Sequence, residues 1–253
     1  EAVKGAIRPE TKIFFVETPT NPMMHVGDIA ALSELVHSQG ALMVVDNTFL
    51  TPYFQRPLTL GADVVVHSAT KYLCGHNDVV AGIAVVKSQE MADFFHAQQK
   101  SHGNGLAPFD SWLILRGLKT LSLRMQRHNE NARQVAAWLR QHPKVKKVYY
   151  VGFEDHPGYE VNRRQSTGFG GMISFELDSE ETAHRLLSEV KMILFAESLG
   201  GTETLVTYPI TQTHESIPDD VRRKLGINEA FVRISIGIED PADIIADLEQ
   251  ALG

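Results

Sequence analysis

A short polar segment after one of the apolar runs carries the residues best suited to chemistry. It reads Ser68-Ala69-Thr70-Lys71 and follows the run Asp63 to Val66. A lysine amine can form a Schiff base with an aldehyde, while hydroxyls beside free backbone N–H groups suit a phosphate. An earlier apolar run ends at Asp46, whose carboxylate could keep a ring nitrogen protonated.

These three groups match the needs of one cofactor, pyridoxal 5'-phosphate, which carries an aldehyde, a phosphate and a pyridine nitrogen. Taken alone, Ser-x-Thr-Lys is a weak signal because its residues are common in loops. An aspartate at the end of a strand is likewise often a helix cap. The order of Asp46 and Lys71 on consecutive apolar runs is what favours a shared site.

The elements that must position these groups are buried strands. Ile29, Leu32, Leu35 and Val36 recur at helical spacing between Asp28 and Gly40, and they predict a helix between the first two strands. Buried strands separated by helices predict an α/β fold with a mainly parallel sheet, which binds ligands at the carboxyl ends of its strands. The apolar run 12–16 predicts a strand buried on both faces, 41–45 a second buried strand, and 63–66 and 79–86 a third and a fourth strand.

The second half of the chain has a different pattern. A long helical region is expected from about Pro108 to His142, with Gly117 as a possible break. Strands that alternate apolar and polar residues follow, together with two or three helices. We therefore predict that residues 1–142 belong to a large cofactor-binding domain that includes the linking helix, and that residues 143–253 form a smaller α+β domain.

Composition excludes several classes of protein. The chain has 253 residues, 43% of them hydrophobic, and a formal net charge of -7, which offers no global attraction to nucleic acid. No apolar run approaches the roughly 20 residues that span a bilayer. The single cysteine, Cys74, and the lack of a leader favour a cytoplasmic protein. Because the chain opens at Glu1 without Met, we expect it to be part of a longer polypeptide.

Four segments in the same order closely resemble the Cys/Met-metabolism family of pyridoxal-phosphate enzymes, the cystathionine synthases and lyases and their relatives. The resemblance covers essentially the whole chain and implies the aspartate aminotransferase-like fold (fold type I). The segments are Glu17-Thr18-Pro19-Thr20-Asn21-Pro22, Val45-Asp46-Asn47-Thr48-Phe49, His67-Ser68-Ala69-Thr70-Lys71-Tyr72 and Ser198-Leu199-Gly200-Gly201-Thr202-Glu203.

The resemblance implies a cofactor-binding role for five residues. Lys71 would hold pyridoxal phosphate through a Schiff base and then move protons. Asp46 would pair with the pyridinium nitrogen, and Ser68 and Thr70 would bind the phosphate. Asn21 would lie near the ring hydroxyl.

The resemblance also implies substrate-binding residues. Arg233 matches the arginine that binds the substrate carboxylate, a role that suits its planar fork, and Ser198 matches a serine near the substrate backbone. Glu197 matches a glutamate typical of γ-synthases and γ-lyases, although it could also be a surface carboxylate. Together with the segment 208–214, it favours a bacterial type of cystathionine γ-synthase that uses an acylated homoserine and cysteine. Cystathionine γ-lyase, cystathionine β-lyase and methionine γ-lyase remain alternatives.

Family members carry a preceding section that supplies further phosphate ligands, a tyrosine on the ring and residues for the neighbouring subunit's site. This section is absent from the chain, so the piece alone could be inactive. The resemblance implies a homo-oligomer, a tetramer built from dimers with shared sites, that acts on a small amino acid and needs neither nucleic acid nor membrane. A protein of another class, which holds the cofactor without turnover or regulates a partner, is the rival hypothesis.

Other conspicuous residues have plainer interpretations. His67 is expected to be a packed histidine. Cys74, His76 and Asp78 lack the usual spacing of zinc ligands, so no metal site is expected. Trp112 and Trp138 are expected to pack in the core or at an interface. The basic residues of the helical region, interpreted as a solvated or subunit-contact face, are Lys119, Arg124, Arg127, His128 and Arg133.

Overall fold

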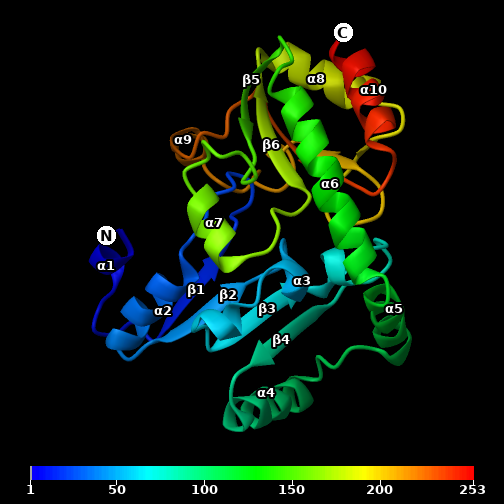
Figure 1. Cartoon of the computed structure of the whole chain (residues 1–253). Helices are drawn as coiled ribbons and strands as arrows, with labels where there is room; N and C mark the ends of the chain where they lie inside the picture. Colours follow the sequence, from blue (N-terminus) through cyan, green and yellow to red (C-terminus); the bar gives the residue numbers. More distant parts are fainter. Residues whose placement is uncertain (1) are drawn as a thin grey trace.

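A computed structural model describes residues 2–253 and contains two β-sheets that are linked by long helices (Figure 1). The strand order of the first sheet is β1-β2-β3-β4, and that of the second is β5-β6-β9-β8-β7. The strands are β1 (Ile13–Glu17), β2 (Leu42–Asp46), β3 (Val64–Ser68), β4 (Gly82–Val86), β5 (Val145–Tyr149), β6 (Met172–Leu177), β7 (Leu194–Phe195), β8 (Leu205–Thr207) and β9 (Phe231–Ser235).

The first sheet has the parallel core that the apolar runs predict. Strands β1, β2 and β3 are parallel, and Glu17 stands opposite Asp46 in the register of β1 and β2. The antiparallel β4 makes the sheet mixed. Because parallel strands end at the same edge, the polar residues that follow them meet there.

Burial of β1 on both faces is a prediction that the structure corrects. Phe14 and Val16 pack against the core under α2, whereas Ile13 and Phe15 on the other face are 58% and 59% exposed. The strand lies at the edge of its sheet, and α2 covers only one face of that sheet (Figure 1).

The second sheet is mostly antiparallel, and helices cover one of its faces. Strands β6 and β9 lie at its centre, and α6, α8 and α10 pack over them (Figure 1). Strand β5, which carries the lysine-rich run 144–147, lies at the edge of this sheet. The strands of the first sheet precede residue 142 and those of the second follow it. The division of the chain into two domains near this residue stays a prediction.

The helices of the chain differ in how well the sequence predicts them. The expected region from Pro108 to His142 is two helices, α5 and α6, separated at Lys119 and Thr120. Helix α4 follows no apolar periodicity and buries none of its residues, so the sequence pattern does not predict it. The helices are α1 (Ala2–Ala6), α2 (Ile29–Ser38), α3 (Thr51–Phe54), η1 (Pro57–Leu60), η2 (Ala69–Leu73), α4 (Gln89–His102), α5 (Pro108–Leu118), α6 (Leu121–Leu139), α7 (Tyr159–Gln165), α8 (Glu180–Glu189), α9 (Asp219–Lys224) and α10 (Pro241–Leu252).

The predictions about side chains of these helices have different outcomes. Trp138 packs against the core of the second sheet, while Trp112 is 53% exposed, so its packing at an interface stays a prediction. The basic residues of α6 do not form one solvated face, because Arg124 and His128 are buried. Both turn inward because backbone carbonyls there accept their hydrogen bonds. Within residues 2–253, no helix is long and apolar enough to cross a membrane.

Candidate active site

Lys71 lies in a distorted turn at the carboxyl end of β3. The turn, η2, is a single turn of π-helix, and Lys71 interrupts it with φ −89° and ψ −133°. Its carbonyl accepts a hydrogen bond of 2.8 Å from the Gly75 N–H. Its Nζ lies 3.1 Å from the Oγ of Ser198, a residue with φ +97° in the loop after β7. The turn therefore presents the amine to a loop of the second sheet.

The surroundings of Lys71 lower the pKa of its amine. Burial lowers the pKa of Lys71, and the positive charge of Arg233 lowers it further, while Glu197 acts in the opposite direction. A neutral amine is the nucleophilic form of lysine. The shift is in the direction that attack on an aldehyde requires.

Asp46 is held in place by Thr48. The Oδ1 of Asp46 accepts hydrogen bonds from the N–H of Thr48 at 2.9 Å and from its hydroxyl at 2.6 Å. The same hydroxyl accepts a bond of 2.8 Å from the N–H of Ser68. Thr48 thus ties the ends of β2 and β3 together and fixes the carboxylate between them.

The two hydroxyls predicted to bind phosphate differ in their contacts. The hydroxyl of Thr70 accepts a hydrogen bond of 2.9 Å from the N–H of Ala81 and donates one of 3.3 Å to its carbonyl. The Ser68 side chain is half-buried at the end of β3, and it is the N–H of Ser68 that bonds to Thr48. Thr70 therefore anchors the turn to the start of β4, which leaves Ser68 as the better-placed hydroxyl for a ligand.

Arg233, on the central strand β9, is buried beside the same site. Its Nη1 donates to the Asn21 side-chain oxygen at 3.0 Å, and its Nη2 donates at 2.9 Å both to the Ser198 carbonyl and to the Thr207 hydroxyl. The Nε is buried without a partner among residues 2–253. Burial lowers the pKa of Arg233 to about 10. The guanidinium is thus fixed in orientation and retains unused donors.

Glu17 supports Asn21 from the end of β1. Its carboxylate accepts the N–H of Asn21, whose side chain in turn accepts from Arg233. Burial raises the pKa of Glu17; the Asn21 N–H and Arg233 oppose this shift, and Asp46 adds to it. Asn21 therefore lies between the two charged groups, in contact with the arginine.

A cleft borders this cluster of side chains. It has a volume of about 540 Å³, and Thr70, Asn77, Glu197 and Ser198 are among its lining residues. Glu197 is therefore at the cleft, close enough to Lys71 and Arg233 to act on the pKa of both.

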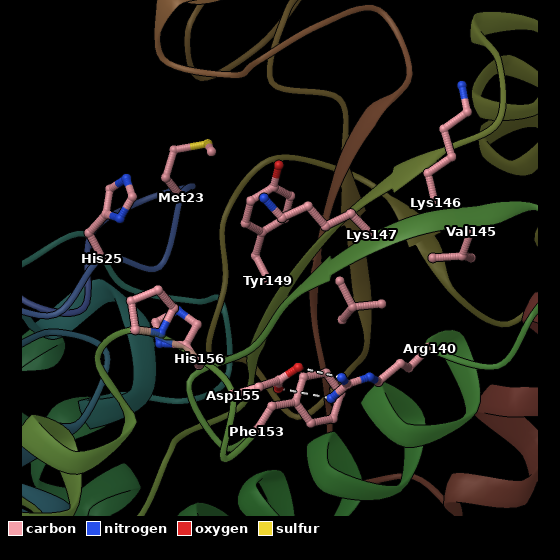
Figure 2. A pocket seen from close by; sticks show the side chains of 12 residues that line it. Met23, His25, Arg140, Val145, Lys146, Lys147, Tyr149, Phe153, Asp155 and His156 are labelled. Carbon is pink, nitrogen blue, oxygen red and sulfur yellow. Dashed lines mark hydrogen bonds and ion pairs between the residues drawn. The ribbon is translucent and has the colours of Figure 1, made fainter.

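A second hollow lies apart from this cluster and contains none of the predicted site residues. It has a volume of about 430 Å³ and is lined by β5 and two loops (Figure 2). In Figure 2, Arg140 pairs with Asp155 above Phe153, while Lys147 reaches over Tyr149. Its lining includes this exposed ion pair, two lysines and two histidines.

Two conspicuous polar segments have ordinary contacts. His67 is buried, as expected of a packed histidine, and burial lowers its pKa. The Cys74 thiol donates to Asp78 at 3.0 Å, and burial raises the pKa of this thiol to about 11. Residues 2–253 contain no cluster of three potential metal ligands.

The predicted site residues converge, but the residues that fix them are not predicted from the sequence. Lys71, Ser198, Asn21 and Arg233 form one chain of contacts, with Asp46 at the neighbouring strand end. The three residues that hold them, Glu17, Thr48 and Thr207, have no role predicted from the sequence. The position of Thr48 two residues after Asp46 is a local signal for a side-chain turn, whereas Thr207 has no such signal.

A lysine of lowered pKa after a parallel strand, an anchored aspartate and a buried arginine fit a class of enzyme that works with an aldehyde cofactor. The chain belongs to the family described as "Cys/Met metabolism PLP-dependent enzyme", whose model matches residues 1–253. Pyridoxal 5'-phosphate is the cofactor of this family.

Relatives and solved structures support this assignment. The chain is 50% identical over its whole length to "Cystathionine gamma-lyase" of Bacillus subtilis and 47% identical over 99% of its length to "Cystathionine beta-lyase, chloroplastic" of Arabidopsis thaliana. It spans 66% and 54% of those proteins. The crystal structure of cystathionine γ-lyase from Lactobacillus plantarum, complexed with L-serine, matches 99% of the chain at 44% identity and a TM-score of 0.95, and the chain covers 66% of it. These matches confirm the expected fold.

Proposed function

We propose that this chain supplies the lysine, the aspartate and the carboxylate-binding arginine of an enzyme that replaces the γ-substituent of an acylated homoserine with cysteine. The observation that carries the proposal is the position of the Lys71 amine, 3.1 Å from Ser198 in the chain of contacts that leads to Arg233. Glu197 next to Ser198 is the feature that favours chemistry at the γ carbon.

The residues present fit pyridoxal phosphate. Lys71 has a pKa lowered by burial and Arg233, as an amine that binds an aldehyde requires. One oxygen of Asp46 is occupied by Thr48, which leaves the other for the ring nitrogen. Ser68 is available for the phosphate, and Asn21 for the ring hydroxyl. When bound, the cofactor supplies an electron sink that acidifies the Cα proton of an amino acid.

The residues of the chain would then bind the substrate and move its protons. Arginine has five N–H donors, and three of those of Arg233 are in use, which leaves one on Nη1 and the buried one on Nε. A substrate carboxylate would bind the fork by replacing part of its present partners. Once its amine is free, Lys71 can move the protons of the Cα and of the neighbouring carbon, one at a time: removal of the second lets the γ-substituent leave as its anion, and both carbons regain a proton after cysteine has added. The Ser198 hydroxyl would hold the amine in position between these transfers.

Glu197 would act on the second amino acid in the reaction. Its carboxylate lies at the cleft, where it can attract the ammonium group of cysteine or of the distal half of cystathionine. A γ-lyase binds that same distal half. The 50% identity to the Bacillus subtilis protein named cystathionine γ-lyase therefore makes γ-lysis the second candidate.

The test uses the full-length protein in two incubations. One contains O-acetyl- or O-succinylhomoserine with cysteine, and the other contains cystathionine alone. Formation of cystathionine in the first supports γ-replacement. Release of cysteine and 2-oxobutanoate only in the second would overturn it in favour of γ-lysis, and pyruvate with homocysteine would indicate β-lysis.

Absorbance spectra distinguish an enzyme from the rival class, a protein that holds the cofactor without turnover. A substrate-dependent change in the visible spectrum supports an enzyme, whereas a yellow protein with an unchanging spectrum would support the rival. A cytoplasmic tetramer with shared sites, acting on a small amino acid, remains our proposal for the whole protein. Size measurement by light scattering checks the oligomeric state.

A further inference from the structure

Arg124 is a buried arginine that bonds almost entirely to backbone carbonyls. Its Nη1 donates to the Tyr72 carbonyl at 2.7 Å, and its Nη2 donates to the carbonyls of Gly117 at 2.9 Å and Leu73 at 3.4 Å. Its Nε donates to the Thr120 hydroxyl at 3.1 Å. No carboxylate within residues 2–253 forms an ion pair with it. Its charge is therefore balanced by peptide groups.

These carbonyls lie at the ends of two helical segments. Tyr72 and Leu73 are the last residues of η2, and Gly117 is the next to last residue of α5. The carbonyl end of a helical segment carries partial negative charge, which favours a cation there. A buried guanidinium needs acceptors for its N–H donors. Arg124 and the carbonyl ends of η2 and α5 therefore hold each other in place.

The turn that carries Lys71 depends on such outside support. Lys71 itself has non-helical backbone angles, so the turn is not a regular helix that maintains its own geometry. Gly75, with φ +75°, lets the turn close over the guanidinium, since a Cβ there would lie 2.1 Å from Nη1 of Arg124. A Cβ at Gly117 would lie 2.2 Å from the Cys74 carbonyl. Both glycines thus permit close contact between the turn and α5.

We propose that Arg124 is a positioning residue for Lys71, because its planar fork fixes the two peptide groups after Lys71 against the end of α5. The amine is thereby directed toward Ser198. This inference rests on the role proposed for Lys71. A lysine at position 124 would keep the charge but could not reach the same carbonyls through a rigid fork.

The test compares Arg124→Lys and Arg124→Met with Asn131→Ala in the full-length protein freed of cofactor. Asn131 is a matched control, because it is buried on the same helix and donates to the carbonyls of Gly237 and Glu239 without contacting the turn. The first readout is amide hydrogen exchange across residues 69–75. The second is the pH dependence of acylation of the Lys71 amine, followed by mass spectrometry. Neither readout requires turnover.

Both Arg124 variants should exchange the amides of residues 69–75 about tenfold faster than the wild type, because local opening becomes easier. The midpoint of Lys71 acylation should rise toward that of an ordinary lysine as its burial is lost. Asn131→Ala should lower the unfolding temperature without either effect. Wild-type protection and an unchanged acylation midpoint in Arg124→Lys would overturn the proposal. Faster exchange of residues 69–75 and a raised midpoint in Asn131→Ala would also overturn it.

A milder variant covers the case in which the Arg124 variants do not fold. Thr120→Val removes the partner of Nε, together with the bond that the same hydroxyl donates to the Gly117 carbonyl. It should speed exchange in the same segment by a smaller factor, about threefold, and no change there would contradict the proposal. The result is distinguishable from failure of the proposed function, because a fixed turn would still be found if the cofactor were attached at a different lysine.

Discussion

The Nζ of Lys71 and the Oγ of Ser198 lie 3.1 Å apart although 127 positions separate the two residues in the chain. Lys71 follows β3 of the first sheet, and Ser198 follows β7 of the second. This contact joins the two sheets at the candidate site. Because Ser198 also offers its carbonyl to Arg233, the lysine and the arginine are positioned by one residue.

Replacement of Arg233 should weaken binding of the amino-acid substrate in the full-length enzyme. Arg233→Ala is expected to raise KM by about 10- to 100-fold, since hydrogen bonds to charged groups contribute about 1.5–3 kcal/mol. Thr207→Val, which removes one partner of the guanidinium, should raise KM less. Steady-state kinetics provide the measurement. Arg140→Ala is the control, because its exposed pair with Asp155 contributes little; equal KM values for Arg233→Ala and this control would place the carboxylate site elsewhere.

Asp46 should be essential to the chemical step, and Thr48 should support it. Asp46→Asn is expected to lower kcat by roughly 10²- to 10³-fold, as for other lost electrostatic stabilisers, with a weaker effect on cofactor binding. Thr48→Val should lower kcat by about 3- to 10-fold, because Asp46 loses the hydrogen bond from the Thr48 hydroxyl and the Ser68 N–H loses its acceptor. Single-turnover kinetics would detect both. Thr59→Val serves as the control, because it loses only a bond at the start of η1. A wild-type rate in Asp46→Asn would show that Asp46 only caps the turn.

The buried His128 should make the protein less stable in acid. Burial lowers the pKa of His128 to about 4, although its bond to the Ile236 carbonyl acts the other way. The unfolded state binds a proton below about pH 6.5, so the free energy of unfolding should fall from there toward pH 4 by on the order of 2 kcal/mol.

His128→Asn tests this expectation, because an amide can still donate to Ile236 but does not titrate. Urea unfolding of the wild type and the variant between pH 4 and 7 should give curves that converge as the pH falls. The exposed His102→Asn is the control. Parallel curves for wild type and His128→Asn would show that His128 is not the titrating group.

The sequence predicts the parts of this site that depend on local pattern. Continuous apolar runs indicate β1 to β3, and residues at the ends of parallel strands must meet, which places Asp46 beside Lys71. Contacts between distant segments leave no such pattern. The partners of Arg124 and Arg233 lie on other elements of the chain, so burial of a basic residue on α6 could not be distinguished from exposure.

The sequence also does not show which strand lies at the edge of a sheet or which face of a helix is covered by neighbouring elements. The runs of β1 and β2 look alike, yet only β1 lies at the edge of its sheet. Trp112 likewise has leucine neighbours at helical spacing but lies on an uncovered face of α5.

The most direct test of the central claim is borohydride reduction of the full-length protein with its cofactor bound, followed by peptide mapping. The reagent fixes a Schiff base in place, so mass spectrometry identifies the lysine that carries it. We predict a single modified peptide with the cofactor on Lys71, and none in Lys71→Ala. Attachment at another lysine, or equal attachment in the variant, would contradict the account.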